Sequence, residues 1–225
     1  MFKQNIFSKE TIVPNQTPLD RDVEEKLCAY ARLLSEGNAR ARLTGPSDPG
    51  TIYEEHILDC LYALPFLEGA ESFIDVGTGG GLPGLVFGIC LPNSRGVLID
   101  SVGKKVKIVA DIASQLGCSN IEVQHVRSEE YAQETREHFS VATARAVTSA
   151  PVLAEYLSPF VKTGGRIVAF KGRNAESEIE PARARWETLG LSEPRLYPYT
   201  HKEKSRFIVV WTKIKNARLA SRASR

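Results

Sequence analysis

The sequence predicts an α/β fold in which a mostly parallel sheet is covered by helices on both faces. Three observations support this prediction. Short apolar runs alternate with helical stretches from residue 72 onward, as they do in chains built from βαβ units. The first run leads into a glycine-rich turn, FIDVGTGGGLPG at residues 73–84. Around residue 203, two further apolar runs are joined by a short polar turn, which predicts an antiparallel hairpin.

Two helices are expected before the sheet. The first starts near Thr17, where Asp20 offers a carboxylate to the free N–H groups of the first turn, and it stops at Gly37. The second spans residues 52–67. We expect both to pack on the edge of the sheet as a cap. The expected division of the chain is an N-terminal segment and helical cap over residues 1–68, a sheet domain over 69–215 and a basic tail over 216–225.

A sheet of seven strands is expected in the remainder of the chain. The five parallel strands are expected at residues 72–76, 96–100, 121–124, 139–143 and 166–170. The helices between them are expected at residues 82–91, 104–116, 129–137 and 149–160. A further helix at 176–189 then precedes the two hairpin strands at 195–200 and 206–212.

The glycine-rich turn predicts a site for an anionic or acceptor-rich ligand. Glycine allows positive φ and lets the backbone approach a ligand without a Cβ in the way. The N-terminus of the following helix offers free N–H groups and the positive end of the helix dipole. A glycine turn between a strand and a helix is the context that nucleotide-containing cofactors require.

Two cofactor classes fit this turn, and the spacing of the glycines does not separate them. The pattern G-x-G-x-x-G, which begins at Gly79, is the dinucleotide fingerprint. The pattern D-x-G-x-G-x-G, which begins at Asp75, is typical of S-adenosylmethionine (SAM) methyltransferases. With either cofactor, Asp100 at the end of the next strand would hold the ribose hydroxyls. The candidate cofactor residues in this region are Asp75, Gly77, Gly79, Gly81 and Asp100.

The hairpin favours SAM. Five alternating units followed by an antiparallel hairpin form the layout of the Rossmann-like class I methyltransferase fold. A dinucleotide-binding domain would instead continue with another parallel unit and a separate substrate domain, for which the sequence leaves no residues.

We expect a cytosolic, monomeric protein without a metal site. The 225 residues are 42% hydrophobic and 25% charged, as is usual for globular proteins. No apolar run approaches the roughly twenty residues of a membrane span, and the first residues lack the apolar core of a signal peptide. The four cysteines are scattered and the four histidines form no ligand motif.

Basic residues follow four consecutive strands of the predicted sheet. Ligands of such sheets bind beyond the carboxyl ends of the strands, and phosphate contacts supply orientation and much of the affinity for nucleic acids. We therefore expect a polyanionic substrate at this rim, although a single exposed cation is usually only solvated. The residues are Lys104, Lys105, Arg127, Arg145, Lys171 and Arg173. A second basic segment, from Lys213 onward, predicts either a solvated tail or a nucleic-acid arm.

With these motifs in place, the chain closely resembles the RsmG (GidB) family, which methylates N7 of a guanine in small-subunit (16S) ribosomal RNA. The matching segments are HILDCL at 56–61, FIDVGTGGGLPG at 73–84, LIDSVGKKVKI at 98–108, ARA around Arg145 and FKG at 170–172. The family often has Asn-Leu-Thr where this chain has Arg42-Leu43-Thr44, and Ser in place of Cys60.

This resemblance implies SAM as cofactor and small-subunit ribosomal RNA, or the ribosomal subunit, as substrate. It implies cofactor contacts at Gly77, Leu82, Ser128, Glu129 and Arg145. It also places Arg145 at the junction of the cofactor and the target base, where we expect a catalytic role. Lys104, Lys105, Lys171 and Arg173 are then the expected RNA contacts.

Guanine N7 chemistry agrees with the residues present. N7 carries an in-plane lone pair and no proton, so it can attack a sulfonium methyl group without a general base, and the enzyme has mainly to align the two groups and exclude water. Two other interpretations stay open at this point. One is an NAD(P)-dependent oxidoreductase, and the other is an RNA-binding module without activity.

Overall fold

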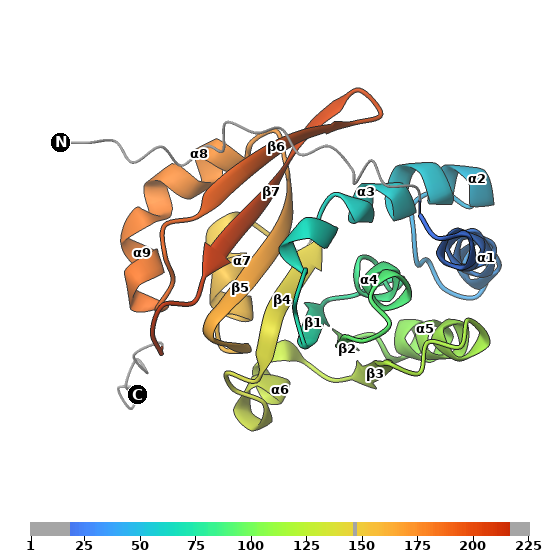
Figure 1. Cartoon of the computed structure of the whole chain (residues 1–225), viewed down its shortest axis with the longest axis horizontal. Helices are drawn as coiled ribbons and strands as arrows, with labels where there is room; N and C mark the ends of the chain where they lie inside the picture. Colours follow the sequence, from blue (N-terminus) through green and yellow to red (C-terminus); the bar gives the residue numbers. More distant parts are fainter. Residues whose placement is uncertain (1–18, 146–147, 217–225) are drawn as a thin grey trace.

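The computed structural model describes residues 19–145 and 148–216, which form three layers. A seven-stranded sheet lies between two groups of helices (Figure 1). The strand order is β3-β2-β1-β4-β5-β7-β6. The strands are β1 Ser72–Val76, β2 Arg95–Asp100, β3 Ile121–His125, β4 Phe139–Arg145, β5 Val161–Gly172, β6 Arg195–His201 and β7 Lys204–Thr212.

The sheet has the topology that the sequence predicts. Strands β1 to β5 are parallel, whereas β7 lies antiparallel between β5 and β6. The class I methyltransferase fold and its C-terminal hairpin are therefore confirmed. Because β1 pairs with β2 on one side and with β4 on the other, the strand order reverses there, and ligands of open α/β sheets bind at such a switch point.

One face of the sheet carries the helices from the first half of the chain. They are α1 Arg21–Asn38, α2 Pro49–Ile52, the π-helical turn Tyr53–Ile57, α3 Leu58–Leu61, the 3₁₀ turn Leu64–Phe66, α4 Gly84–Cys90 and α5 Gly103–Gln115. The continuous helix expected over 52–67 is thus wrong in detail. The helical path starts earlier, contains a π-helical turn and ends in a separate 3₁₀ turn.

The other face carries the later helices, which are α6 Ser128–Glu134, α7 Ala150–Leu157, α8 Ala175–Ile179, the 3₁₀ turn Glu180–Ala182 and α9 Arg183–Thr188. Alternation along the strands divides the core between the faces. Phe73 of β1 faces the first group of helices, and Ile74 faces the second. Trp186 of α9 packs on Trp211 of β7 within the second core, with ring centroids 5.4 Å apart.

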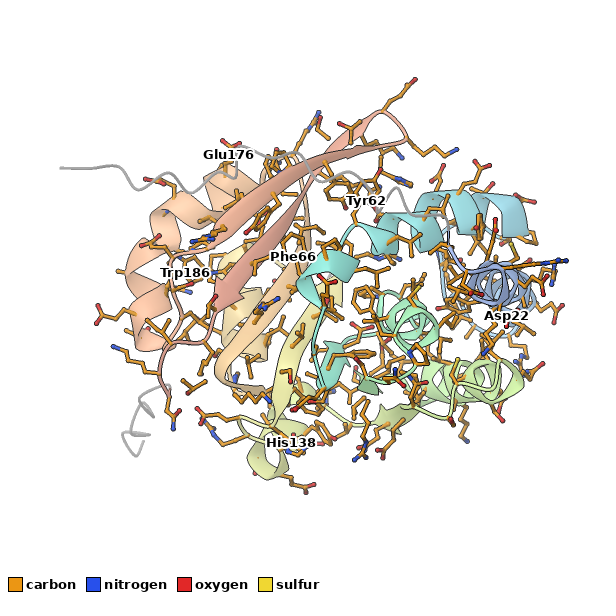
Figure 2. All side chains as sticks on the ribbon, viewed as in Figure 1. Asp22, Tyr62, Phe66, His138, Glu176 and Trp186 are labelled. Carbon is orange, nitrogen blue, oxygen red and sulfur yellow. The ribbon has the colours of Figure 1, made fainter. Side chains whose placement is uncertain are left out.

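The N-terminal helices, residues 21–67, form a cap that packs on α4, α5 and the hairpin, whose strand β6 is an edge of the sheet. Tyr30 of α1 donates a hydrogen bond to the Gly80 carbonyl at 2.7 Å. Tyr62, labelled in Figure 2 where the cap meets the hairpin, stacks on Tyr199 of β6 with ring centroids 4.3 Å apart. The cap and the sheet therefore share one hydrophobic core.

The two ends of the described chain differ from expectation. Asp20 caps α1 by accepting a hydrogen bond from the Asp22 N–H at 2.9 Å, and the expected start at Thr17 lies outside the described residues. Lys213 is not a tail charge, because its buried Nζ donates to the carbonyls of Ser158 and Leu189 at 3.0 and 3.2 Å. The remainder of the predicted basic tail, residues 217–225, is also outside the described chain.

Two features are absent from residues 19–145 and 148–216. Within these ranges, the helices are too short or too polar to cross a membrane. The same residues contain no group of three or more His, Cys, Asp or Glu side chains that could hold a metal ion.

Candidate active site

The glycine-rich turn after β1 leaves space for a ligand. The N–H groups of Gly77 and Thr78 donate to the Ile99 carbonyl of β2 at 2.9 and 3.1 Å, which ties the turn to the neighbouring strand. Gly79 has φ +59°, and a Cβ built on it would meet only the Gly77 carbonyl oxygen, 4.0 Å away. The backbone at Gly79 therefore takes a conformation that favours glycine and borders open space.

Asp75 supports this turn from below. Its buried Oδ2 accepts hydrogen bonds from Thr78 Oγ1 at 2.7 Å and from the Gly84 N–H at 2.9 Å. Burial raises the pKa of Asp75 to about 6, although both hydrogen bonds favour the ionised form. Its Oδ1 is buried and has no hydrogen-bond partner in the described chain. Asp75 is not among the residues that line the adjacent cavity, so its observed role is to hold the turn and the start of α4.

The first cavity lies beyond the carboxyl ends of β1 to β4 and has a volume of about 370 Å³. Ligand cavities in this size range bind small molecules through an apolar lining and a few placed polar groups. We call it the cofactor cavity. It is lined by Val76, Gly77, Ile99, Asp100, Ser101, Val126, Arg127, Ser128, Glu129, Arg145, Leu153 and Tyr156.

Most residues that the sequence assigned to a cofactor meet at this cavity. Gly77 and Asp100 come from the first two strand ends, Ser128 and Glu129 from the start of α6, and Arg145 from the end of β4. The other four predicted residues do not line the cavity: Asp75 lies beneath the turn, Gly79 lies within the turn, and Gly81 and Leu82 are buried. A Cβ on Gly81 would lie 2.8 Å from Tyr30 Oη, so packing against the cap explains that glycine.

A second, smaller cavity lies beside the first. Its volume is about 190 Å³, and it is lined by Arg145, Phe170, Lys171, Gly172, Tyr199 and Arg206. We call it the second cavity. Arg145 lines both cavities. The strand pairings explain how these residues meet, because Arg145 of β4 pairs with Phe170 of β5, and Gly172 of β5 pairs with Arg206 of β7.

A buried carboxylate from the cap stands behind the second cavity. Asp59 of α3 is fully buried, and its Oδ2 accepts from Arg206 Nη1 at 2.9 Å and contacts Arg145 Nη1 at 3.4 Å. Its Oδ1 accepts from Tyr199 Oη at 3.0 Å. Burial and the negative charge of Asp59 raise the pKa of Tyr199, so the phenol stays protonated and donates. Arg145 Nη1 also donates to the His56 carbonyl at 3.1 Å.

Four residues of this region were not singled out as site residues from the sequence: Asp59, Phe170, Tyr199 and Arg206. The available signal was Asp59, a carboxylate within the apolar stretch Ile57-Leu58-Asp59-Cys60-Leu61. A charged residue in such a stretch is rarely buried without a partner.

The predicted RNA-binding residues differ in their surroundings. Lys104 and Arg173 are exposed and Lys105 is half-buried, and none of the three lines either cavity. Lys171 is mostly buried, since its Nζ lies 2.6 Å from Glu178 Oε2 and donates to the Thr148 carbonyl at 2.8 Å. The expectation of a free charge at Lys171 is therefore not met.

Comparison with known proteins identifies the family. The family model described as rRNA small subunit methyltransferase G (GidB) matches residues 23–208. The chain belongs to the GidB family.

Relatives in this family are similar over most of the chain. "Ribosomal RNA small subunit methyltransferase G" of Rubrobacter xylanophilus is 41% identical over 194 residues, which cover 82% of this chain and 74% of that protein. The protein of the same name from Brevibacillus brevis is 33% identical over 198 residues, which cover 85% of this chain and 83% of that protein.

Solved structures share the fold at low sequence identity. An O-methyltransferase from Bacillus cereus, crystallised with SAH, has a TM-score of 0.61 at 17% identity, covering 88% of this chain and 94% of that one. The O-methyltransferase TomG from Streptomyces achromogenes, crystallised with SAM, has a TM-score of 0.57 at 12% identity, covering 87% and 91%.

Family and fold together make this GidB protein a SAM-dependent methyltransferase. The cofactor cavity fits such a group. The open space at Gly79 admits a ligand against the backbone, and the Asp100 carboxylate in the cavity wall can accept hydrogen bonds from hydroxyl groups. The oxidoreductase alternative is not supported, because a dinucleotide-binding sheet would have a parallel strand where β7 is antiparallel.

Proposed function

We propose that this GidB protein transfers the methyl group of SAM to N7 of a guanine in small-subunit (16S) ribosomal RNA. The observation that carries the proposal is that Arg145 lines both the cofactor cavity and the second cavity. Groups bound in the two cavities would therefore meet beside one guanidinium. The names of the relatives supply the RNA class, and the resemblance to RsmG supplies guanine N7.

The second cavity has the chemistry of a site for an unpaired base. Its lining combines the aromatic residues Phe170 and Tyr199, both largely buried, with the partly exposed arginines Arg145 and Arg206. Proteins recognise unpaired RNA bases by stacking on aromatic rings and arginine planes and by hydrogen bonds to the base edges. Arginine donors suit the acceptors O6 and N7 on the edge of guanine that carries the methylated atom.

When bound, SAM supplies a methyl group on a sulfonium centre. Gly77, Asp100, Ser128 and Glu129 would hold the cofactor, with Gly79 leaving room for it. Asp75 would act from beneath the turn through the contacts that it makes to Thr78 and Gly84.

Arg145 would then orient the target base beside the cofactor cavity. No residue has to remove a proton, because N7 has none. Alignment of the two groups and exclusion of water therefore account for the catalytic contribution of the chain.

Exposed basic residues would guide the RNA to the site. Lys104, Lys105 and Arg173 would bind phosphates, whereas Lys171 would act mainly through its ion pair with Glu178. Such contacts position RNA without reading its sequence. This substrate implies a cytoplasmic enzyme, and we expect a monomer.

Transfer of radiolabelled methyl groups from SAM to purified small-subunit ribosomal RNA, and to assembled subunits, tests the proposal. An N7-methylated guanosine can be located by reduction and aniline cleavage of the chain, because N7 methylation makes the glycosidic bond labile. We expect label at one guanine. Label at a position that resists this cleavage would contradict N7 as the acceptor.

Calorimetric titration with SAM and with NADP⁺ provides a second test. We expect SAM alone to bind, which would exclude the oxidoreductase. Binding of neither SAM nor NADP⁺ would contradict the proposed activity and favour an RNA-binding module without activity.

A further inference from the structure

We infer that Asp59 is a positioning residue for methyl transfer: its buried carboxylate holds Arg145 and Arg206 in place between the cofactor cavity and the second cavity. This inference rests on the proposed function, since it assigns a target nucleotide to the second cavity. Asp59 touches neither cavity, so it would act only through the two arginines.

Three distant elements converge on the Asp59 side chain. Arg145 lies at the end of β4, Arg206 near the start of β7 and Tyr199 on β6, and all three contact the Asp59 carboxylate. The cap adds a second anchor, since the His56 carbonyl accepts from Arg145. His56 lies in the π-helical turn, and π-helical turns are frequent at functional sites.

Both arginines keep donors that Asp59 does not occupy. Each guanidinium has five N–H groups. Across the part of the chain that the structure describes, Arg145 and Arg206 contact protein acceptors only through Nη1. Both side chains keep some exposure, 14% for Arg145 and 28% for Arg206, and both line the second cavity. Asp59 therefore contacts one terminal nitrogen, Nη1, of each guanidinium group and leaves the other N–H donors for a ligand.

The charges of the cluster do not cancel. One carboxylate faces two guanidinium groups, whereas Lys171 in the same cavity wall is neutralised by Glu178. Asp59 alone therefore leaves one positive charge of the two arginines uncompensated. A phosphate group or the acceptor edge of a guanine would compensate it, and arginine pairs with such groups in two-point geometry.

A role in packing alone explains the buried carboxylate of Asp59 less well than a role in holding the two arginines. Replacing a buried ion cluster with apolar side chains of similar volume is often neutral or stabilising. Apolar side chains could therefore pack the cap on the sheet at this position, whereas only an acceptor such as the Asp59 carboxylate can hold two arginines through hydrogen bonds.

The test compares Asp59→Asn with Lys213→Met in the full chain. Both variants remove a fully buried charge, but Lys213 lines neither cavity and contacts Ser158 and Leu189. Thermal unfolding, SAM affinity by calorimetry and single-turnover methylation at saturating RNA are measured for each. For Asp59→Asn we expect SAM affinity within about twofold of the parent and a rate constant lower by on the order of a hundredfold, because a displacement of about 1 Å at the reacting groups has that effect.

Lys213→Met should lose thermal stability without losing rate. Equal loss of rate in both variants, or an unchanged rate in Asp59→Asn, would overturn the inference. If Asp59→Asn does not fold, Asp59→Glu replaces it. This variant keeps the charge and moves the carboxylate by one methylene, so we again expect a lower rate with SAM affinity retained, and a parental rate would overturn the inference.

A crystal structure of the Asp59 variant separates this inference from the proposed function. If the unmodified enzyme methylates no RNA, the proposed function fails, and the positions of the guanidinium groups then decide the role of Asp59. Displacement of Arg145 and Arg206 supports the inference, and unmoved side chains overturn it.

Discussion

The carboxylate of Asp100 and the backbone N–H of Gly79 form a hydrogen bond of 2.9 Å, which links the end of β2 to the glycine turn after β1. The other carboxylate oxygen of Asp100 accepts from the Val102 N–H, also at 2.9 Å. Two backbone groups therefore fix this side chain in the wall of the cofactor cavity. A carboxylate held in this way is oriented before the ligand arrives, which reduces the entropy lost on binding.

Replacing Asp100 should weaken SAM binding. Loss of a hydrogen bond to a charged group typically costs about 1.5–3 kcal/mol, or roughly ten- to hundredfold in affinity. Asp100→Ala also leaves the Gly79 N–H without its acceptor, so we expect it to lose more affinity than Asp100→Asn. Calorimetry with SAM measures both, with Asp111→Asn on the exposed face of α5 as the control. Affinity within error of the parent would refute the ribose contact.

Gly79→Val should abolish SAM binding while the fold is retained. Valine at φ +59° costs on the order of 1–2 kcal/mol of backbone strain, and its side chain would fill the open space beside the turn. Gly117→Val is the matched control, because Gly117 has φ +66°, borders open space and follows the end of α5, outside the glycine turn. Circular dichroism and SAM titration are the measurements. Equal SAM affinity in the two variants would show that strain, not the ligand space, governs the site.

Asp75 should make the free enzyme less stable as pH rises. Its pKa is about 6 in the folded protein against an ordinary value of 3.8, so between these values the folded state binds more protons than the unfolded state. The stability linked to Asp75 is then fully present below about pH 4 and is lost as pH rises through about 6. A shift of this size corresponds to about 3 kcal/mol.

Denaturant unfolding between pH 4 and pH 8 measures this contribution. Asp75→Asn should remove the fall in the free energy of unfolding, while Asp111→Asn should keep it. The same pH dependence in the parent and in Asp75→Asn would disprove the assignment.

RNA affinity should depend on the exposed lysine at the start of α5. Phosphate binding releases counterions, so affinity falls with salt with a logarithmic slope of roughly −0.7 per single-strand contact. Lys104→Ala should weaken RNA binding and flatten that slope by about one contact, without changing SAM affinity. Lys162→Ala removes a lysine at the opposite end of the sheet, where it pairs with Glu71, and should have no effect. Filter binding across a salt series tests both variants. Equal slopes for the two would contradict a phosphate contact at Lys104.

Arg145→Ala should depress methyl transfer more than RNA binding. Arg145 lines both cavities, so its loss misaligns the reacting groups, whereas phosphate contacts elsewhere keep most of the RNA affinity. We expect a decrease in single-turnover rate on the order of a hundredfold with a much smaller change in RNA affinity. Equal losses in rate and affinity would indicate a binding role alone.

The sequence predicted the sheet well because its signals are local. Each strand is a short apolar run bounded by turn residues, and the polar turn near residue 203 requires an antiparallel hairpin. The cofactor residues Gly77 and Asp100 were predicted for the same reason, since they lie directly at strand ends.

What the sequence could not predict depends on contacts between distant residues. The π-helical turn at 53–57 interrupts a stretch whose apolar pattern reads as one helix. Asp59 and Arg206 are 147 positions apart, and only the packing of the cap on the hairpin brings them together. Lys171 was expected to follow its strand as a rim cation, but it lies within β5, and its pairing with Glu178 depends on where α8 lies. Burial of Asp75 likewise depends on the position of α4 above it.

Because β7 is the last strand to be synthesised but lies between β5 and β6, the two cavities become complete at different stages of translation. Every residue that lines the cofactor cavity has been synthesised once the ribosome reaches Tyr156. The second cavity also needs Arg206 of β7. Asp59 is synthesised much earlier, but it cannot pair with Arg206 until β7 enters the sheet. A nascent chain can therefore assemble the cofactor side first, as N-terminal parts of a protein generally fold earlier, but it cannot complete the site for the second reactant until its last strand is in place.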